Sequence, residues 1–277
     1  MPELPEAETI ARGLRRTILG RRLGPARFTR PDILRNRGDA PVSDITGHRV
    51  VEVFRRGKRV LIKLDNDLTL VFALGMTGQL TVARTDAACP THTHLRIALD
   101  RGARELRFRD VRRFGGVWLL KDGVTGQKSR GRALGPLGPE PLEIRITQFR
   151  SLLRRKRQIK ALLLDQSIIA GLGNIYCDEA LHRASIHPAA RADDLTPDQS
   201  AALLRGIRAV LREAIRRGGS SISDYRDAQG NLGYFQHRHR VYQRTDQPCH
   251  RCRTPIQRII VAARSTHFCP ACQPPRV

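Results

Sequence analysis

The chain has 277 residues, enough for two domains of ordinary size with buried cores. Its 50 lysines and arginines against 26 aspartates and glutamates give a formal net charge of +24, which favours a polyanionic partner such as nucleic acid, although an arginine-rich surface without such a partner would have the same composition. No apolar run is long enough to span a membrane and the acidic start lacks the pattern of a secretory signal, so we expect a cytoplasmic protein without membrane contact.

The first half of the chain predicts a helix followed by a β-sandwich. A helix is expected from Pro5, because proline suits the first helical turn and Ile10, Leu14 and Ile18 recur at helical spacing. Short β-rich runs follow, separated by Gly, Asp and Asn turns, and they predict two packed antiparallel sheets. The runs are residues 50–54, 60–64, 68–74, 80–83, 95–99, 105–108 and 117–120.

The second half predicts helices and a small β-ribbon. Gly, Pro and charged residues at 121–143 indicate a linker, and helices are expected at about 147–164, 174–184 and 196–217. The last helix opens with Thr196 and a Gln199 capping partner. We therefore expect an α+β protein with an N-terminal helix and antiparallel β-sandwich at 1–120, a linker at 121–143, a helical domain at 144–234 and a β-ribbon at 235–277.

Four cysteines near the C-terminus have the spacing of a metal site. Cys249, Cys252, Cys269 and Cys272 form a C-x₂-C-x₁₆-C-x₂-C pattern, which predicts one structural zinc ion per chain. Four thiolates fill the tetrahedron and leave no position for water, so catalysis must occur elsewhere. Between the two pairs, Arg258 and Arg264 can donate to phosphate, or they are ordinary solvated arginines.

The N-terminus combines an amine with two acids. Removal of Met1 would leave Pro2 as a secondary amine beside Glu3 and Glu6. An α-amino group has a pKa of about 7.7–8.0 against about 10.4 for lysine, so it is a better nucleophile at neutral pH and could attack a sugar C1′ to give an imine. On these residues alone, a proline-started helix with acids at its positive end is the simpler interpretation.

Several short motifs occur in one order from end to end, and together they resemble the formamidopyrimidine-DNA glycosylase family. They are Met1-Pro2-Glu3-Leu4-Pro5-Glu6, Gly57-Lys58, Gly75-Met76-Thr77-Gly78, Arg112-Arg113-Phe114-Gly115, Gly171-Leu172-Gly173-Asn174-Ile175-Tyr176 and the four cysteines. The resemblance implies a helix–two-turn–helix element in the helical domain and a C-terminal zinc β-ribbon. Leu4, where the related endonuclease VIII typically has glycine, favours the oxidised-purine branch.

The resemblance implies a bifunctional DNA glycosylase and AP lyase of base excision repair. Its partner would be double-stranded DNA with oxidised purines, namely 8-oxoguanine opposite cytosine and formamidopyrimidines, and it would act as a monomer at the bacterial nucleoid. Pro2 would attack C1′ of the damaged nucleotide, Glu3 would supply acid/base assistance and Glu6 would support the same site. The imine then permits β- and δ-elimination, which makes the enzyme both a glycosidase and a lyase.

Other residue roles are implied in the same way. Lys58 and Arg264 would join the catalytic site. The expected DNA contacts are Lys160, Asn174, His94, Arg113 and Arg155, and the expected fillers of the gap left by the extruded base are Met76, Arg112 and Phe114. Residues 218–233 resemble a mobile loop that closes over the lesion. Asn174 is also expected as a helix N-cap.

Two residues depart from the family pattern, and two alternative functions remain open. Ala73 and Val111 stand where the family usually has histidine and proline, which leaves loop rigidity and fine specificity open. An oxidised-pyrimidine glycosylase of the endonuclease VIII type is one alternative function, and a non-catalytic zinc-finger DNA-binding protein is the other. Pro2, Glu3 and Glu6 argue against the second, because binding alone needs none of them.

Overall fold

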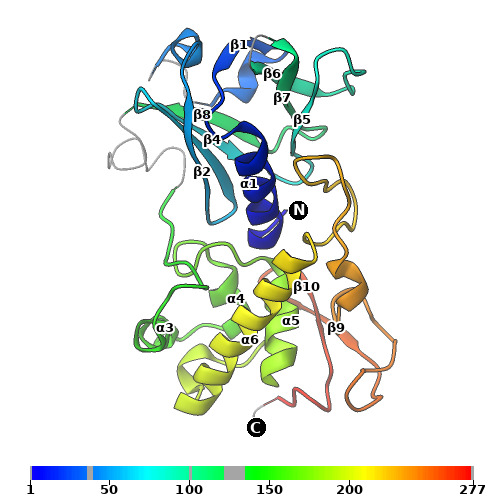
Figure 1. Cartoon of the computed structure of the whole chain (residues 1–277). Coiled ribbons are helices and arrows are strands. Elements are labelled where there is room, and N and C mark those ends of the chain that lie inside the picture. The colour runs from blue at the N-terminus through cyan, green and yellow to red at the C-terminus, as the bar shows by residue number, and fades with distance from the viewer. Residues whose placement is uncertain (1, 36–39, 100–101, 122–134, 276–277) are drawn as a thin grey trace. The chain divides into compact units, whose positions relative to one another are not determined.

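The computed structural model describes residues 2–35, 40–99, 102–121 and 135–275 (Figure 1). The chain divides into two compact units: unit 1 comprises Met1–Pro136 and Arg217–Tyr234, and unit 2 comprises Leu137–Arg216 and Phe235–Val277. This division differs from the expected helical domain at 144–234, because Arg217–Tyr234 makes its contacts with the N-terminal unit. Most of the expected linker, residues 122–134, lies outside the described residues.

Unit 1 contains two four-stranded antiparallel sheets, ordered β1-β6-β7-β5 and β2-β3-β4-β8, which confirms the predicted sandwich. All seven predicted runs form strands, β2 to β8. β1 was not predicted from the sequence. It contains Gly24 and Pro25 and lies at a sheet edge, where a residue without an N–H donor is tolerated. The strands are β1 (Leu23–Phe28), β2 (Val50–Arg56), β3 (Arg59–Leu64), β4 (Thr69–Ala73), β5 (Gln79–Arg84), β6 (Thr93–Leu99), β7 (Arg104–Arg109) and β8 (Gly116–Leu120).

Helix α1 (Leu4–Ile18) packs its apolar stripe on this sandwich (Figure 1). Ile10, Leu14 and Ile18 are fully buried in the same cluster as residues of both sheets. Burying each such side chain contributes about 1.5–3 kcal/mol, so the stripe holds the start of the chain against the sheet.

Strand β2 runs antiparallel to α1. The Gly20 N–H donates to the Val50 carbonyl at 2.8 Å beyond the C-terminal end of α1, while Arg55 Nε pairs with Glu8 Oε2 at 3.1 Å in its first half. The turn after β2 therefore lies at the end of unit 1 where α1 begins.

Unit 2 contains the predicted helices and ribbon, with one correction. The single helix expected at 147–164 is two helices, broken where residues 154–157 are four consecutive cations and where Gln158 forms an isolated bridge with Arg191. Like charges one turn apart destabilise a helix. The elements are α3 (Ile146–Leu153), α4 (Ile159–Leu164), α5 (Asn174–Ala184), α6 (Pro197–Arg216), β9 (Gln257–Val261) and β10 (Arg264–Phe268).

The predicted capping box of α6 is confirmed. Thr196 N–H donates to Gln199 Oε1 at 3.0 Å, and Gln199 N–H donates to Thr196 Oγ1 at 3.2 Å. Short 3-10 helices are η1 (Pro31–Ile33), η2 (Val42–Ile45), η5 (Ala192–Asp194) and η6 (Phe235–Arg238). Over the part of the chain that the structure describes, every helix is too short or too polar to cross a membrane.

Candidate active site and metal centre

The start of α1 brings Pro2, Glu3 and Glu6 together, as the sequence predicts. All three are buried, with Glu3 2% and Glu6 1% exposed. Glu3 is the N-cap residue, and its carboxylate accepts the Glu6 N–H while Glu6 Oε2 accepts the Glu3 N–H at 2.8 Å. This reciprocal capping box holds both acids in fixed positions beside Pro2.

The second oxygen of Glu6 binds the segment after α6. Glu6 Oε1 accepts the Ser220 N–H at 2.7 Å, and a Cβ added to Gly219 would lie 2.8 Å from the same oxygen. Gly219 also has a φ of +83°, so both its space and its backbone conformation favour glycine. Residues 218–233, predicted from the family resemblance to be a mobile loop, are anchored on α1 through Ser220 and Tyr225.

Tyr225 adds a second anchor between this segment and α1. Its hydroxyl donates to the Glu6 carbonyl at 3.5 Å. Burial, and then the nearby Glu6 carboxylate, raise the pKa of the Tyr225 hydroxyl well above its usual value of 10.0. The hydroxyl therefore stays protonated and remains a donor at any physiological pH.

Lys58 lies in the turn between β2 and β3, where it is partly exposed. Because β2 runs antiparallel to α1, this turn is at the end of unit 1 that also holds Pro2 and Glu3. The catalytic role of Lys58 stays a prediction.

The three predicted gap-filling residues are on two loops that cross between the sheets. Met76 lies between β4 and β5, and Arg112 and Phe114 lie between β7 and β8. Because β4 pairs with β8 and β5 pairs with β7, the two crossings are side by side. Met76 is 37% and Phe114 60% exposed, and the Arg112 guanidinium lies 4.5 Å from the Phe114 ring centroid. These side chains are therefore presented at the surface and are not core residues.

Asp110, which was not predicted from the sequence, connects the two loops. The carboxylate is fully buried; Oδ1 accepts the Thr77 hydroxyl at 2.6 Å and Oδ2 accepts the Gly115 N–H at 2.7 Å. Thr77 Oγ1 in turn accepts the Arg112 N–H at 3.0 Å. A Cβ at Gly75 would lie 2.4 Å from the Gly115 nitrogen, so the loops meet backbone to backbone.

His94 and Arg113, both predicted DNA contacts, line one cavity of about 380 Å³ together with Arg30. His94 is buried, and its Nε2 lies 2.9 Å from the Asp110 carbonyl. Arg113 has a φ of 54° and forms an exposed ion pair with Asp32 at 3.3 Å. A non-glycine residue in this left-handed region is unusual and often marks a functional loop.

In unit 2, Asn174 and Arg264 line one cavity of about 780 Å³, which Arg258 also lines. The expected N-cap role of Asn174 is wrong: Gly173 is the N-cap, and the Asn174 amide instead donates to the Ser265 carbonyl at 2.9 Å. Arg155 lies elsewhere in the unit, exposed, with its Nη1 donating to the Leu152 carbonyl at 2.8 Å.

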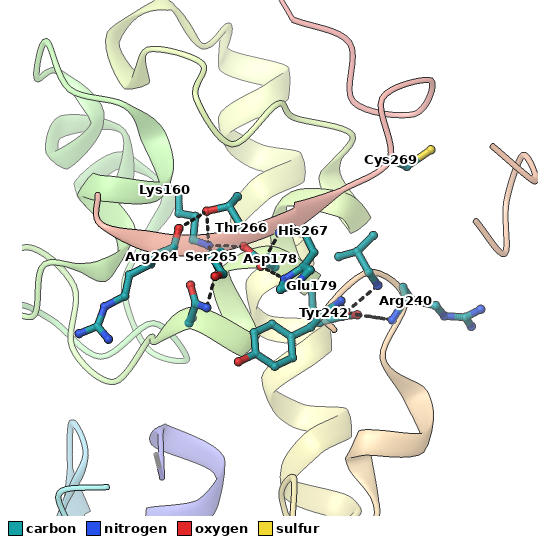
Figure 2. A network of polar contacts seen from close by, with 12 residues as sticks. Lys160, Asp178, Glu179, Arg240, Tyr242, Arg264, Ser265, Thr266, His267 and Cys269 are labelled. Atoms are coloured by element: carbon teal, nitrogen blue, oxygen red, sulfur yellow. Dashed lines mark hydrogen bonds and ion pairs between the residues drawn. The ribbon is translucent and has the colours of Figure 1, made fainter. Parts of the chain in front are cut away.

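Lys160 is a correction to the predicted DNA contacts. Its side chain is fully buried, and its Nζ lies 2.6 Å from Asp178 Oδ1 (Figure 2). An ammonium enclosed in this way does not reach a ligand at the protein surface, so a direct contact between Lys160 and DNA is incompatible with the structure. The sequence showed a lysine among arginines but gave no sign of its burial.

The four cysteines converge as predicted. Their Sγ atoms all lie within 4.8 Å of one another, with Cys252 Sγ 3.4 Å from both Cys269 Sγ and Cys272 Sγ. A zinc ion with bonds of about 2.3 Å to four thiolates needs sulfur–sulfur edges of about 3.8 Å, so the cluster fits tetrahedral zinc. The ion would link Cys249 and Cys252, before β9, to Cys269 and Cys272, after β10.

Together these features define a protein with a buried N-terminal proline site in unit 1 and a zinc ribbon in unit 2. Three family models match the chain: the formamidopyrimidine-DNA glycosylase N-terminal domain at residues 1–117, the formamidopyrimidine-DNA glycosylase H2TH domain at 137–226, and a zinc finger found in FPG and IleRS at 246–275. The chain belongs to the formamidopyrimidine-DNA glycosylase family.

Individual relatives agree with this assignment. The chain is 44% identical to a formamidopyrimidine-DNA glycosylase of Solibacter usitatus over 99% of both chains, and 46% identical to that of Chloroflexus aggregans over 99% of this chain and 98% of the relative. The crystal structure of MutM (FPG) from Thermus thermophilus matches with a TM-score of 0.85 and 42% identity over 98% of each chain. Lactococcus lactis Fpg in complex with abasic-site DNA matches with a TM-score of 0.90 and 36% identity over 99% of this chain and 100% of that chain.

Proposed function

We propose that this chain excises oxidised purines, namely 8-oxoguanine opposite cytosine and formamidopyrimidines, from double-stranded DNA and then cleaves the strand at the abasic site. Its family membership makes it a DNA glycosylase of base excision repair with AP lyase activity. Similar structures include MutM bound to DNA with carbocyclic 8-oxo-G and Fpg bound to abasic-site DNA. The observation that carries the proposal is the buried group of Pro2, Glu3 and Glu6 at the start of α1.

In this proposal Pro2 is the nucleophile. After removal of Met1, its nitrogen forms a bond to C1′ as the glycosidic bond breaks, and Glu3 assists proton transfer at the sugar. Loss of the nitrogen proton and opening of the sugar give an iminium ion, which acidifies the C2′ proton. Loss of that proton expels the 3′ phosphate by β-elimination, and δ-elimination then expels the 5′ phosphate. Glu6 fixes Glu3 and the segment around Ser220.

We propose that cations and donors on each unit bind the DNA backbone. His94 and Arg113 would do so from the cavity of unit 1, and Asn174 and Arg264 from the cavity of unit 2. Arg155, which lines neither cavity, would be a further contact. Lys58 and Arg264 would also support the reacting nucleotide. Met76, Arg112 and Phe114, exposed on their braced loops, would fill the space of the extruded base. The enzyme would act as a monomer, in the cytoplasm at the nucleoid.

Borohydride trapping on a duplex with 8-oxoguanine opposite cytosine tests this function. We expect a covalent complex whose proteolytic digestion places the DNA on the N-terminal peptide. A protein with an acetylated or methionine-extended N-terminus has an amide at this position and should lose both base excision and strand cleavage. DNA attached to Lys58 instead would refute the assignment, and faster excision of an oxidised pyrimidine would favour the endonuclease VIII type.

A further inference from the structure

We propose that the buried pair Lys160–Asp178 is a positioning device that fixes β10, and with it Arg264, at the cavity shared with Asn174. The proposal rests on the proposed function, because it assigns this cavity to DNA. Neither residue lines the cavity. Both would therefore act through β10, which they contact (Figure 2).

The Lys160 ammonium has an acceptor for each of its three N–H groups. Besides Asp178 Oδ1 at 2.6 Å, Nζ lies 2.7 Å from Thr266 Oγ1 and 3.2 Å from the Ser265 carbonyl oxygen. A buried cation is tolerated when it is paired and hydrogen-bonded in this way. Two of the three acceptors belong to β10, directly after Arg264.

Asp178 holds the same strand from α5. Its Oδ2 accepts the His267 N–H at 2.9 Å, and Asn174, four residues earlier on α5, donates to the Ser265 carbonyl at 2.9 Å. Residues four apart lie on one face of a helix. This face of α5 therefore contacts alternate residues of β10, and Lys160 from α4 contacts the residues between Arg264 and His267.

These contacts replace a missing strand. β9 and β10 form a two-stranded sheet, so one edge of β10 lacks a strand partner among the described residues. Backbone groups on such an edge need other partners when they are buried. The Ser265 carbonyl and the His267 N–H receive theirs from the side chains of α4 and α5.

A buried charge pair suits positioning more than stability. Packed apolar side chains of similar volume are often as stabilising as a buried ion pair, but they could not form hydrogen bonds to the Ser265 carbonyl or the His267 N–H. A slip of β10 by one residue would move the Ser265 carbonyl and the His267 N–H away from their partners on α4 and α5 and would turn Arg264 to the opposite face. The pair therefore selects the one register that presents Arg264 beside Asn174.

The test uses the zinc-loaded full chain and a duplex with a tetrahydrofuran abasic analogue opposite cytosine. The double variant Lys160→Met/Asp178→Asn removes both charges at similar volume, so no uncompensated charge remains inside. We expect one zinc per chain, a thermal midpoint near that of the parent, and a Kd weakened about tenfold at one fixed salt concentration. A parental Kd would overturn the proposal.

A mutant cycle with Arg264→Ala separates positioning from general damage. Arg264→Ala alone should also weaken binding about tenfold, and because the pair acts through Arg264, combining it with the double variant should add no more than about twofold. Independent effects would multiply to about a hundredfold, and that result would show that the pair does not act through Arg264.

Thr266→Val provides a second route if the double variant does not retain zinc. Valine has the shape of threonine but removes one acceptor of Lys160, so we expect a Kd weakened about threefold. In the Arg264→Ala background, Thr266→Val should leave the Kd almost unchanged. An unchanged Kd for Thr266→Val would reject the proposal. Asp193→Asn removes an exposed ion pair with Arg191 on the same unit and should bind like the parent; an equal loss there would also reject it.

The two proposals fail in different ways. Binding to the abasic analogue requires no base excision, so a parent chain that neither binds nor is trapped by borohydride contradicts the proposed function. A parent that binds and is trapped, with variants that bind equally well, contradicts the positioning role alone.

Discussion

Replacing Asp110 tests whether its carboxylate holds the two surface loops of unit 1. The carboxylate accepts two hydrogen bonds in a fully buried site, and a bond to a charged group contributes about 1.5–3 kcal/mol. Asp110→Asn keeps the shape but turns one acceptor into a donor, so the free energy of unfolding of unit 1 should fall by about 1.5–3 kcal/mol. Asp110→Ala loses both bonds and should cost about 3–6 kcal/mol.

The single tryptophan of the chain provides the assay. Trp118 lies in β8, which begins directly after the braced loop, so its fluorescence during denaturant titration reports the unfolding of unit 1. An Asp110→Asn variant within about 0.5 kcal/mol of the parent would refute the bracing role. Asp86→Asn is the matched control, because it removes an exposed ion pair with Arg84 and should leave the midpoint unchanged.

Three more predictions concern base selection, zinc and acid stability. Arg112→Ala should weaken discrimination for the base opposite the lesion by about 1–3 kcal/mol, measured as excision rates opposite cytosine and adenine; an unchanged preference would remove that role. Chelation of zinc should abolish DNA binding while Trp118 fluorescence stays native, and full affinity after chelation would contradict the structural role of the metal. Burial alone would raise the pKa of Glu8, but hydrogen bonds and charges from Arg12 and Arg55 outweigh it and hold the pKa below 4.5. This stabilisation is complete above pH 4.5 and is lost as the pH falls through the lowered pKa, so Glu8→Gln should flatten the acid dependence of unit 1 unfolding; an equally steep dependence would show that these contacts contribute nothing.

The spacing of apolar residues, together with turn and capping residues, predicted most of the fold because these signals are local to each element. Short β-rich runs between Gly, Asp and Asn turns predicted β2 to β8, and the spacing of Thr196 and Gln199 predicted the start of α6, where their reciprocal bonds form. β1 was missed because Gly24 and Pro25 are typical of turns, and only its pairing with β6 makes it a strand. The break between α3 and α4 was missed although the four consecutive cations at 154–157 are a local signal against a helix; the bridge of Gln158 to Arg191 is a tertiary contact that the sequence does not show.

The site was predictable where chemistry requires particular residue types. The cysteine spacing carries its own signal, whereas the acids beside Pro2 were predicted as a site only through the family resemblance; the structure brings each group together. The burial of a side chain and its contacts with residues far along the chain leave no such signal in the sequence. Lys160 pairs with a residue eighteen positions away, and Asp110 acts through Thr77, so sequence alone could not separate a buried brace from a surface contact.

The bond between Glu6 and Ser220 also has a consequence for synthesis on the ribosome. Unit 1 contains the first residues of the chain and also Arg217–Tyr234, so its contacts cannot be completed when the β-sandwich has been translated. At about 5–20 residues per second, Ser220 follows Glu6 by roughly 10–45 s. During this interval the nascent chain has Pro2 and the start of α1 but not the segment that is anchored there, so a truncated product ending before residue 217 would lack a complete unit 1.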